Sequence, residues 1–166
     1  MNVNLFKPYP AQKAFIDAYA DSKHLFGVLV SPRGAGKTLL SINLALYWVL
    51  KHNNTKLGYI TPIYSLGKEV FDIIRSSTLE LIEESNKSDL TIKFINGSTM
   101  KFLSADRADS VRGFRFHYLI MDEVAYLNKK DIESSIIPTL NPNGRKCLMI
   151  STPRGKNHFY EYYLRG

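Results

Sequence analysis

The chain has 166 residues, of which 45% are hydrophobic, and a formal net charge of +7 at pH 7. This length suits one domain with its own core, and the diffuse basic charge favours polyanionic partners such as nucleic acid, although many basic proteins bind none. Several features argue against secretion, membrane insertion and structural zinc. No apolar run reaches about 18 residues, the N-terminus lacks a signal-peptide pattern, and the single cysteine, Cys147, and four scattered histidines lack ligand spacing. One cysteine without a disulfide partner also agrees with an intracellular setting.

The N-terminal segment predicts an extended stretch followed by a helix. Pro8 and Pro10 favour the extended stretch, and residues 11–20 have a helical pattern. Gln12 lies in the first turn of that helix. A glutamine amide can donate to and accept from one edge of adenine, and Tyr9 or Phe6 can lie against the base face. The alternative is an ordinary glutamine on a surface helix, but the motif that follows favours the adenine contact.

A phosphate-binding motif follows, between a predicted strand over 25–30 and a predicted helix over 39–50. Its eight residues are Ser31, Pro32, Arg33, Gly34, Ala35, Gly36, Lys37 and Thr38. They match the GxxxxGK[ST] pattern except for serine at the first position. A strand, a glycine loop and a helix aim backbone N–H groups and the helix dipole at one point, which suits a polyphosphate. Lys37 adds a charge beside the β- and γ-phosphates, and Thr38 offers a hydroxyl to Mg²⁺.

The next segments alternate strand and helix. Residues 57–60 predict a short buried strand, and the apolar spacing after it predicts a helix that reaches about residue 84. This order is typical of a parallel sheet with helices on both faces. Two β-prone runs at 91–95 and 98–103, separated by Asn-Gly, then predict a small antiparallel hairpin.

An apolar strand over 117–121 ends in two adjacent acids, Asp122 and Glu123. A water near a γ-phosphate needs a metal to offset developing charge and a base to orient it. We therefore expect Asp122 to hold Mg²⁺ through its water shell and Glu123 to polarise the attacking water. A solvated turn is the alternative for such a pair, and the buried strand and the phosphate loop argue against it.

The C-terminal third predicts helix, strand and helix. Residues 128–140 have a helical pattern with Asn128 as cap. A buried strand over 146–150 runs into Ser151 and Thr152. Ligands lie beyond the carboxyl ends of parallel strands, so either hydroxyl is placed to sense the γ-phosphate; a plain exit from the strand is the alternative. The aromatic residues of 158–164 predict a helix packed on the sheet, with base stacking as the alternative.

Together these residues resemble a known family. A glutamine in a proline-flanked N-terminal segment, SPRGAGKT, LIMDE and STPRG resemble the ATPase domain of the large terminase subunit, the DNA-packaging motor of tailed phages. The resemblance extends from Pro8 to Gly155. It implies an α/β fold, namely a P-loop NTPase of the additional-strand, catalytic-glutamate type, with a mainly parallel central sheet, helices on both faces and a small β-hairpin. It also implies ATP and Mg²⁺ as cofactors.

The resemblance implies roles for individual residues. They are adenine for Gln12, phosphate and Mg²⁺ for Lys37 and Thr38, the metal for Asp122, hydrolysis for Glu123, and coupling of hydrolysis to motion for Ser151 and Thr152. Two arginines are candidates for catalysis. Arg33 lies inside the loop, one position later than in some relatives. Arg112, in the ADSVRG segment, matches the place from which some relatives supply an arginine to a neighbouring subunit. A solvated loop charge, or an ion pair with Asp109, is the alternative for Arg112.

The implied function is Mg²⁺-dependent ATP hydrolysis that powers translocation of double-stranded viral DNA into a procapsid. The implied partners are double-stranded DNA, further copies of the chain in a homo-oligomeric ring on the capsid portal, and the small terminase subunit, with no membrane. The expected location is the cytoplasm of the infected bacterial host, transiently on the procapsid. We expect residues 1–166 to form a single ATPase domain, without the C-terminal nuclease domain of the family and without nuclease activity. The alternatives are the first motor domain of a superfamily 2-like helicase and a nucleotide-gated binding module with little turnover.

Overall fold

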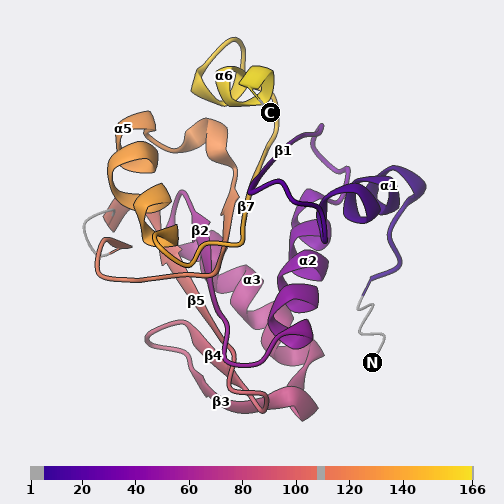
Figure 1. The fold of residues 1–166 in the computed structure, drawn as a ribbon, viewed down its shortest axis with the longest axis vertical. Coiled ribbons are helices and arrows are strands. Elements are labelled where there is room, and N and C mark those ends of the chain that lie inside the picture. The colour runs from indigo at the N-terminus through magenta and orange to yellow at the C-terminus, as the bar shows by residue number, and fades with distance from the viewer. Residues whose placement is uncertain (1–5, 108–110, 166) are drawn as a thin grey trace.

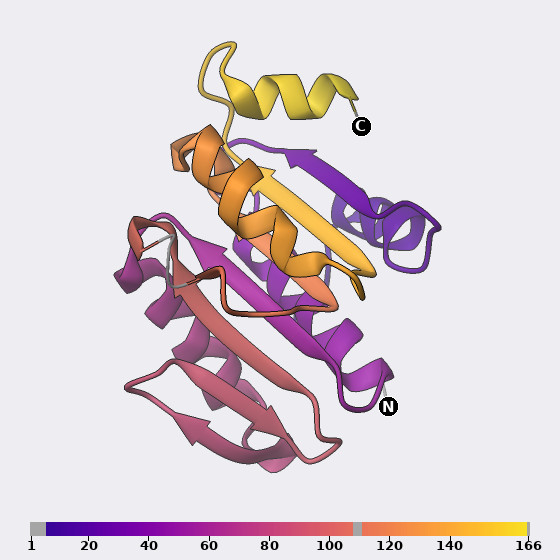
Figure 2. The same ribbon diagram turned by 60° about the vertical axis from the view of Figure 1, so that its left-hand side comes forward.

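The computed structural model describes residues 6–107 and 111–165, and its strands form one sheet with helices packed on both faces (Figures 1 and 2). The strands are β1 (Phe26–Val30), β2 (Lys56–Thr61), β3 (Ile82–Asn86), β4 (Thr91–Phe94), β5 (Thr99–Ser104), β6 (Tyr118–Asp122) and β7 (Lys146–Ser151). The α-helices are α1 (Pro10–Tyr19), α2 (Lys37–Lys51), α3 (Tyr64–Ser77), α5 (Lys129–Asp131) and α6 (His158–Arg165).

The strand order places the sequence motifs side by side. Across the sheet the order is β1-β7-β6-β2-β5-β4-β3, and the first five of these strands are parallel. β7 lies between β1, which leads into the phosphate loop, and β6, which carries the paired acids. The register sets Val30 opposite Ser151 and Asp122 opposite Ile150, so the three strands end at the same edge of the sheet. This arrangement confirms the predicted α/β fold of the additional-strand type.

Both faces of the sheet are buried. Along β6, Tyr118 and Ile120 belong to the core between the sheet and α1, α2 and α3, whereas Leu119 and Met121 belong to the core on the other face, where α5 and the turns after it pack. Figure 2 shows the α5 segment in front of the sheet and α2 and α3 behind it. Alternate side chains of a strand point to opposite faces, so a strand buried on both sides reads as a continuous apolar run. α2 is likewise buried along most of its length, as its apolar sequence predicts.

The segment after α3 differs from the predicted helix that reaches residue 84. α3 ends at Ser77, a 3-10 turn follows over Leu79–Leu81, and β3 then pairs antiparallel with β4. Thr78 leaves the helical region of backbone conformation, with φ −130° and ψ 26°, and so ends the helix. The prediction was wrong because the apolar spacing continues past the end of the helix, whereas β3 becomes a strand through its pairing with β4.

The predicted hairpin belongs to the main sheet. β4 and β5 pair antiparallel across Asn96 and Gly97, and Gly97 has the positive φ of 78° that such a turn requires. β5 also pairs in parallel with β2, with Thr99 opposite Lys56. The hairpin therefore widens the central sheet, and β3 extends it further, so that the antiparallel part is a three-stranded meander.

The helices predicted over 128–140 and 158–164 are present, and the first of them is irregular. The Asn128 side chain accepts a hydrogen bond from the backbone N–H of Lys130 and so caps α5, which continues through a wider turn over Ile132–Ile136 and a tighter one over Ile137–Leu140. α6 buries Phe159, which agrees with the packing interpretation of its aromatic residues. Among the described residues, no helix is both long enough and apolar enough to cross a membrane.

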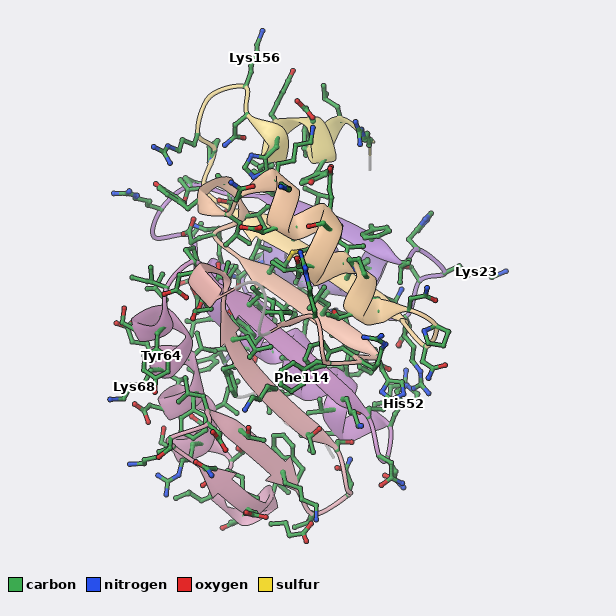
Figure 3. The ribbon with its side chains drawn as sticks, turned by 90° about the vertical axis from the view of Figure 1, so that its left-hand side faces the viewer. Lys23, His52, Tyr64, Lys68, Phe114 and Lys156 are labelled. Atoms are coloured by element: carbon green, nitrogen blue, oxygen red, sulfur yellow. The ribbon has the colours of Figure 1, made fainter. Side chains whose placement is uncertain are left out.

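The parallel strands begin on one side of the molecule and end on the opposite side. Figure 3 shows Tyr64, which begins α3 just after β2 ends, on one side, and His52, which follows α2 and precedes β2, on the other. We call the edge at which the parallel strands end the carboxyl edge, and the one at which they begin the amino edge. The sequence motifs predicted to bind nucleotide all lie at the carboxyl edge.

Candidate nucleotide-binding site

The phosphate loop connects β1 to α2 at the carboxyl edge. Gly34 and Gly36 have positive φ values of 76° and 71°, which favour glycine. Gly36 is the last residue before α2, so the free N–H groups of the first helical turn face the space beyond the sheet. The Ser31 N–H donates to the Ser151 carbonyl at 3.2 Å, which fixes the loop's first residue to β7. Serine at this first position is therefore compatible with the loop.

Lys37 is buried, with 8% of its surface exposed, at the floor of this loop. Within the part of the chain that the structure describes, its ammonium group makes one hydrogen bond, to the Pro32 carbonyl at 3.2 Å, and lies 3.9 Å from the Glu123 carboxylate. An ammonium group has three donors. The Lys37 ammonium therefore has hydrogen-bonding capacity left for an anion that enters the loop.

Asp122 is 5% exposed, and both of its carboxylate oxygens are held. Oδ2 accepts hydrogen bonds from the Tyr59 hydroxyl at 3.0 Å and the Thr38 hydroxyl at 3.3 Å, and Oδ1 accepts from the Glu123 N–H at 2.8 Å. Burial raises the pKa of the Asp122 carboxyl, and the negative charge of Glu123 adds to this, while the Tyr59 hydrogen bond opposes it. A cation beside Asp122 would offset the cost of burying the charge.

The donor set here fits Mg²⁺. The Thr38 hydroxyl and the Asp122 carboxylate supply hard oxygen atoms in direct contact with each other. The described residues contain no cluster of three or more His, Cys, Asp or Glu side chains that could hold a metal by themselves. Mg²⁺ commonly binds through one or two protein oxygens together with substrate phosphates and water. The residues present therefore suit a metal that arrives with a nucleotide.

Glu123 follows directly and has a strained backbone. Its φ of 52° and ψ of 46° lie in the left-handed region, which is uncommon for a residue with a side chain. Its Oε2 atom accepts hydrogen bonds from the Ser151 hydroxyl at 3.2 Å and the Thr152 N–H at 3.4 Å, while Oε1 faces Lys37. The structure thus brings Lys37, Glu123 and the end of β7 together, as predicted from three separate segments.

Thr152 has a second feature of interest. Its Oγ1 atom is buried and has no hydrogen-bond partner among the described residues. Buried polar atoms are nearly always paired, so an unpaired one calls for an explanation such as a bound group, and Asn43 Oδ1 is another among the described residues. The predicted coupling role of Ser151 and Thr152 stays a prediction, and their contact with Glu123 is the geometry on which it rests.

A cavity of about 760 Å³ opens between the phosphate loop and the start of α3. Its loop side is lined by Arg33, Gly34, Gly36, Lys37, Thr38 and Leu39, and its far side by Pro62, Ile63, Leu66, Glu123 and Tyr126. Arg33 therefore lies at the cavity, although its predicted contact with a γ-phosphate is not tested. Apart from Glu123, the far side was not predicted from the sequence, although the Thr-Pro pair at which β2 ends gave a signal at the same edge.

Tyr126 extends the site beyond the predicted residues. It is 47% exposed, and the guanidinium group of Arg154 lies 4.8 Å from its ring centre, a distance suited to a cation–π contact. Arg154 belongs to the STPRG segment after β7. This contact joins that segment to the rim of the cavity.

Gln12 contacts the phosphate loop rather than open space. Its side-chain amide donates to the carbonyls of Ala35 at 3.0 Å and Gly36 at 3.1 Å, and its Oε1 accepts from the Tyr9 N–H at 3.0 Å. Tyr9 itself is 66% exposed. Gln12 therefore fastens the N-terminal segment to the loop, a role that the sequence analysis did not foresee, and its predicted contact with adenine is not tested.

Arg112 lies on the loop that leads into β6, away from this constellation. Its Nε atom donates to the Ser135 hydroxyl at 2.9 Å, and it is not among the described residues that line the cavity. Asp109, the alternative partner considered from the sequence, lies outside the described residues. The predicted role of Arg112 in a neighbouring subunit stays a prediction.

Comparisons with known proteins point to one family. The family described as the N-terminal part of the terminase large subunit, T4likevirus-type, matches residues 28–165. The terminase large subunit of Escherichia phage T5 is 33% identical over 165 residues, a match that covers 96% of this chain and 37% of that protein. The chain therefore spans little more than a third of this relative's length.

Solved structures show the same fold. The large terminase ATPase domain of Thermus phage P74-26 superposes with a TM-score of 0.82 at 24% identity, over 97% of this chain and 71% of that one. The large terminase of another thermophilic bacteriophage, solved in complex with ADP, gives a TM-score of 0.77 at 16% identity, over 96% and 42%. On the match to residues 28–165 and the likeness to the T5 protein, this chain belongs to the terminase large subunit family and corresponds to the N-terminal part of those proteins.

Proposed function

We propose that this domain binds ATP with Mg²⁺ and hydrolyses it, and that hydrolysis in the intact protein drives double-stranded DNA into a procapsid. One observation carries the proposal: the Glu123 carboxylate faces the Lys37 ammonium at 3.9 Å on one side and the Ser151 hydroxyl at 3.2 Å on the other. A base, a phosphate-binding cation and a strand end thus meet at the mouth of a cavity large enough for a nucleotide.

The residues divide the chemistry between them. The phosphate loop and Lys37 bind the β- and γ-phosphates through backbone N–H groups and a buried ammonium. Thr38 and Asp122 hold Mg²⁺, which when bound neutralises charge that develops on the phosphates. Glu123 accepts a hydrogen bond from water and orients it toward the γ-phosphate. Oε1 already faces Lys37 at the cavity, and we infer that the carboxylate turns further when water and the γ-phosphate are bound, so that Oε2 leaves its contacts at β7.

This inferred turn of the carboxylate supplies a route from chemistry to motion. Glu123 is bonded to the Ser151 hydroxyl and the Thr152 N–H, and Ser151 also accepts a hydrogen bond from the Ala125 N–H at 3.1 Å. A change in the direction of the Glu123 carboxylate therefore alters the partners of the first residues after β7. Arg154 of the same segment contacts Tyr126 at the rim. We infer that Ser151 and Thr152 report the state of the γ-phosphate to this segment.

The larger machine is part of the proposal. Relatives of this family are named as terminase large subunits, so the intact protein is inferred to act on double-stranded DNA as a homo-oligomeric ring at the portal, with the small terminase subunit, in the host cytoplasm and on the procapsid. Arg112 bonds to Ser135 and is not among the described residues that line the cavity of its own chain, and we infer that it acts at a neighbouring subunit. In that position an arginine would stabilise the transition state of its neighbour.

The decisive experiment compares Glu123→Gln with the unchanged protein. We expect ATP turnover in the presence of Mg²⁺ to fall by about 10² to 10⁴, because the amide cannot accept the proton of the attacking water. Affinity for ADP, measured by calorimetry, should stay within about twofold, because no phosphate contact is removed. Glu84→Gln on β3, far from the cavity, is the matched control and should leave both quantities unchanged.

The outcomes separate the alternatives. Equal turnover in the two proteins would show that Glu123 is not the base. Nucleotide binding without turnover in either protein would favour the nucleotide-gated binding module. For the intact protein, ATP-dependent protection of DNA inside procapsids supports the packaging function, whereas separation of a forked duplex would support the helicase alternative.

A further inference from the structure

Tyr59 lies at the centre of a buried hydrogen-bond network beneath the nucleotide site. The residue belongs to β2, next to β6, and its side chain is 0% exposed. Its hydroxyl donates to Asp122 Oδ2 at 3.0 Å and lies 2.7 Å from the Ser41 hydroxyl of α2. The Ser41 hydroxyl is in turn 2.8 Å from the Thr38 carbonyl. The network therefore connects β2, β6 and the first turn of α2.

The number of hydroxyl hydrogens determines which group donates and which accepts in this network. Each hydroxyl has one hydrogen to donate. With Asp122 ionised, the carboxylate can only accept, so the Tyr59 hydrogen points to Asp122. The Ser41 and Tyr59 oxygens are 2.7 Å apart, so the Ser41 hydrogen lies between them, and Ser41 shares it with the Thr38 carbonyl at 2.8 Å. Tyr59 thus links Asp122 to Ser41 of α2, in addition to the direct hydrogen bond that Thr38 of the same helix donates to Asp122.

Packing alone does not account for this hydroxyl. The ring of Tyr59 packs against Phe102, with centroids 5.8 Å apart, and phenylalanine would fill the same space. A buried hydroxyl costs free energy unless it is hydrogen-bonded. Its described bonds go to Asp122 and Ser41, and the Asp122 bond holds the oxygen that also accepts from Thr38. The hydroxyl therefore serves the carboxylate rather than the core.

We propose that Tyr59 is a positioning residue that fixes the orientation of the Asp122 carboxylate for Mg²⁺. The inference rests on the proposed function, since it concerns the metal of that site. Glu123 N–H holds Oδ1 and Tyr59 holds Oδ2, so the plane of the carboxylate is set from both sides. Partners of this kind around a metal ligand typically change metal affinity by about 10- to 100-fold when they are removed.

The test is Tyr59→Phe, with Tyr19→Phe as the matched control. Tyr19 is also buried, and its hydroxyl bonds to the carbonyls of Leu25 and Cys147 near the amino edge. The measurement is a calorimetric titration of Mg²⁺ into each protein saturated with ADP, together with ADP affinity in the absence of Mg²⁺. We expect Tyr59→Phe to raise the Mg²⁺ concentration at half-saturation about 10- to 100-fold and to leave metal-free ADP affinity unchanged. Tyr19→Phe should change neither.

Other results would overturn either the positioning role of Tyr59 or the proposed function. An unchanged Mg²⁺ midpoint in Tyr59→Phe, or equal shifts in both variants, would overturn the positioning role. If Tyr59→Phe does not fold, Ser41→Ala replaces it: a rise of a few-fold in the Mg²⁺ midpoint is expected, because the Tyr59 oxygen loses a partner, and no change would overturn the inference. Failure of the unchanged protein to bind ADP, or to bind Mg²⁺ with ADP, would instead contradict the proposed function.

Discussion

Lys37 and Lys146 are two buried lysines at opposite edges of the same parallel sheet. They are 8% and 6% exposed. The Lys146 ammonium donates to the Ser22 carbonyl, to the Ser22 hydroxyl at 3.0 Å and to the His24 carbonyl at 2.8 Å, which uses all three of its donors. Among the described residues the Lys37 ammonium makes a single hydrogen bond, to Pro32. A buried lysine therefore indicates a binding site only where some of its three N–H donors make no hydrogen bond within the protein.

The same contrast extends to the neighbouring groups. Near the amino edge the Tyr19 hydroxyl bonds to two carbonyls and its ring lies 4.8 Å from the Lys146 ammonium. At the carboxyl edge Asp122 is buried with a raised pKa, Glu123 has a left-handed backbone, and the buried Thr152 Oγ1 has no partner among the described residues. Near the amino edge Asn54 also has a left-handed backbone and burial lowers the pKa of Lys146. What distinguishes the carboxyl edge is therefore the hydrogen-bonding capacity that Lys37 and Thr152 leave unused among the described residues.

The largest expected effect is the loss of ATP affinity when Lys37, but not Lys146, is replaced. Lys37→Ala should weaken ATP binding about 10- to 100-fold, because a hydrogen bond to a charged group contributes about 1.5–3 kcal/mol. Lys146→Met should leave ATP affinity unchanged and instead lower the free energy of unfolding by about 1–3 kcal/mol, since it removes the hydrogen bonds that the buried ammonium makes to the Ser22 and His24 oxygen atoms. Calorimetry and denaturant unfolding on both variants measure these quantities. A loss of ATP affinity in Lys146→Met equal to that in Lys37→Ala would remove the distinction.

Gln12 shares features with both lysines. Its contacts are all made inside the chain, as for Lys146, yet it lies beside the phosphate loop and is predicted to bind adenine. We expect Gln12→Ala to weaken ATP binding about 5- to 10-fold, and GTP binding less, because a bidentate contact to adenine contributes at least about 1 kcal/mol. Competition binding with both nucleotides gives the ratio. An equal loss for ATP and GTP would show that Gln12 only fastens the loop.

The smallest effect concerns stability and pH. Burial raises the pKa of Asp122 above its ordinary value, so the folded protein keeps this proton at pH values where the unfolded chain has lost it. The free energy of unfolding therefore falls as pH rises through that window and stays lower above it. Asp122→Asn should accordingly raise the unfolding temperature of the nucleotide-free protein at pH 7 by a few degrees, since about 1 kcal/mol corresponds to about 2–4 °C at this chain length.

Two further measurements check that the Asp122 charge lowers the unfolding temperature. The difference between Asp122→Asn and the unchanged protein should shrink as the pH is lowered to well below about 4, where the carboxyl is protonated in both states. Lys146→Met should lower the unfolding temperature at pH 7, which is the opposite sign at the opposite edge. An Asp122→Asn protein that melts below the unchanged one at pH 7 would contradict the account.

The sequence predicted the parallel part of the fold and the loop, acid and hydroxyl segments of the site. These signals are strong because β6 and β7 are buried on both faces, and because β1, β6 and β7 each end directly in polar residues. β3 was missed because its side chains are mostly exposed and its partner lies in another segment. Long-range pairing of this kind leaves little trace in a local pattern.

The missed site residues have a similar explanation. Tyr59 sits inside an apolar strand, where its hydroxyl gives no signal until β6 is placed beside it. Ile63 and Tyr126 come from separate loops that meet only across the cavity. The contact of Gln12 with the phosphate loop likewise depends on how the N-terminal segment folds back. Residues within a motif were predictable, whereas residues that complete the site from outside a motif were not.

The most direct test of the account is a crystal structure of this domain with Mg²⁺ and a non-hydrolysable ATP analogue. The account predicts the β- and γ-phosphates within hydrogen-bonding distance of the Lys37 ammonium, Mg²⁺ beside the Thr38 hydroxyl and the Asp122 carboxylate, and a Glu123 oxygen turned from Ser151 toward the γ-phosphate. A triphosphate bound elsewhere, or bound with Lys37 and Glu123 unchanged and out of contact with it, would contradict it.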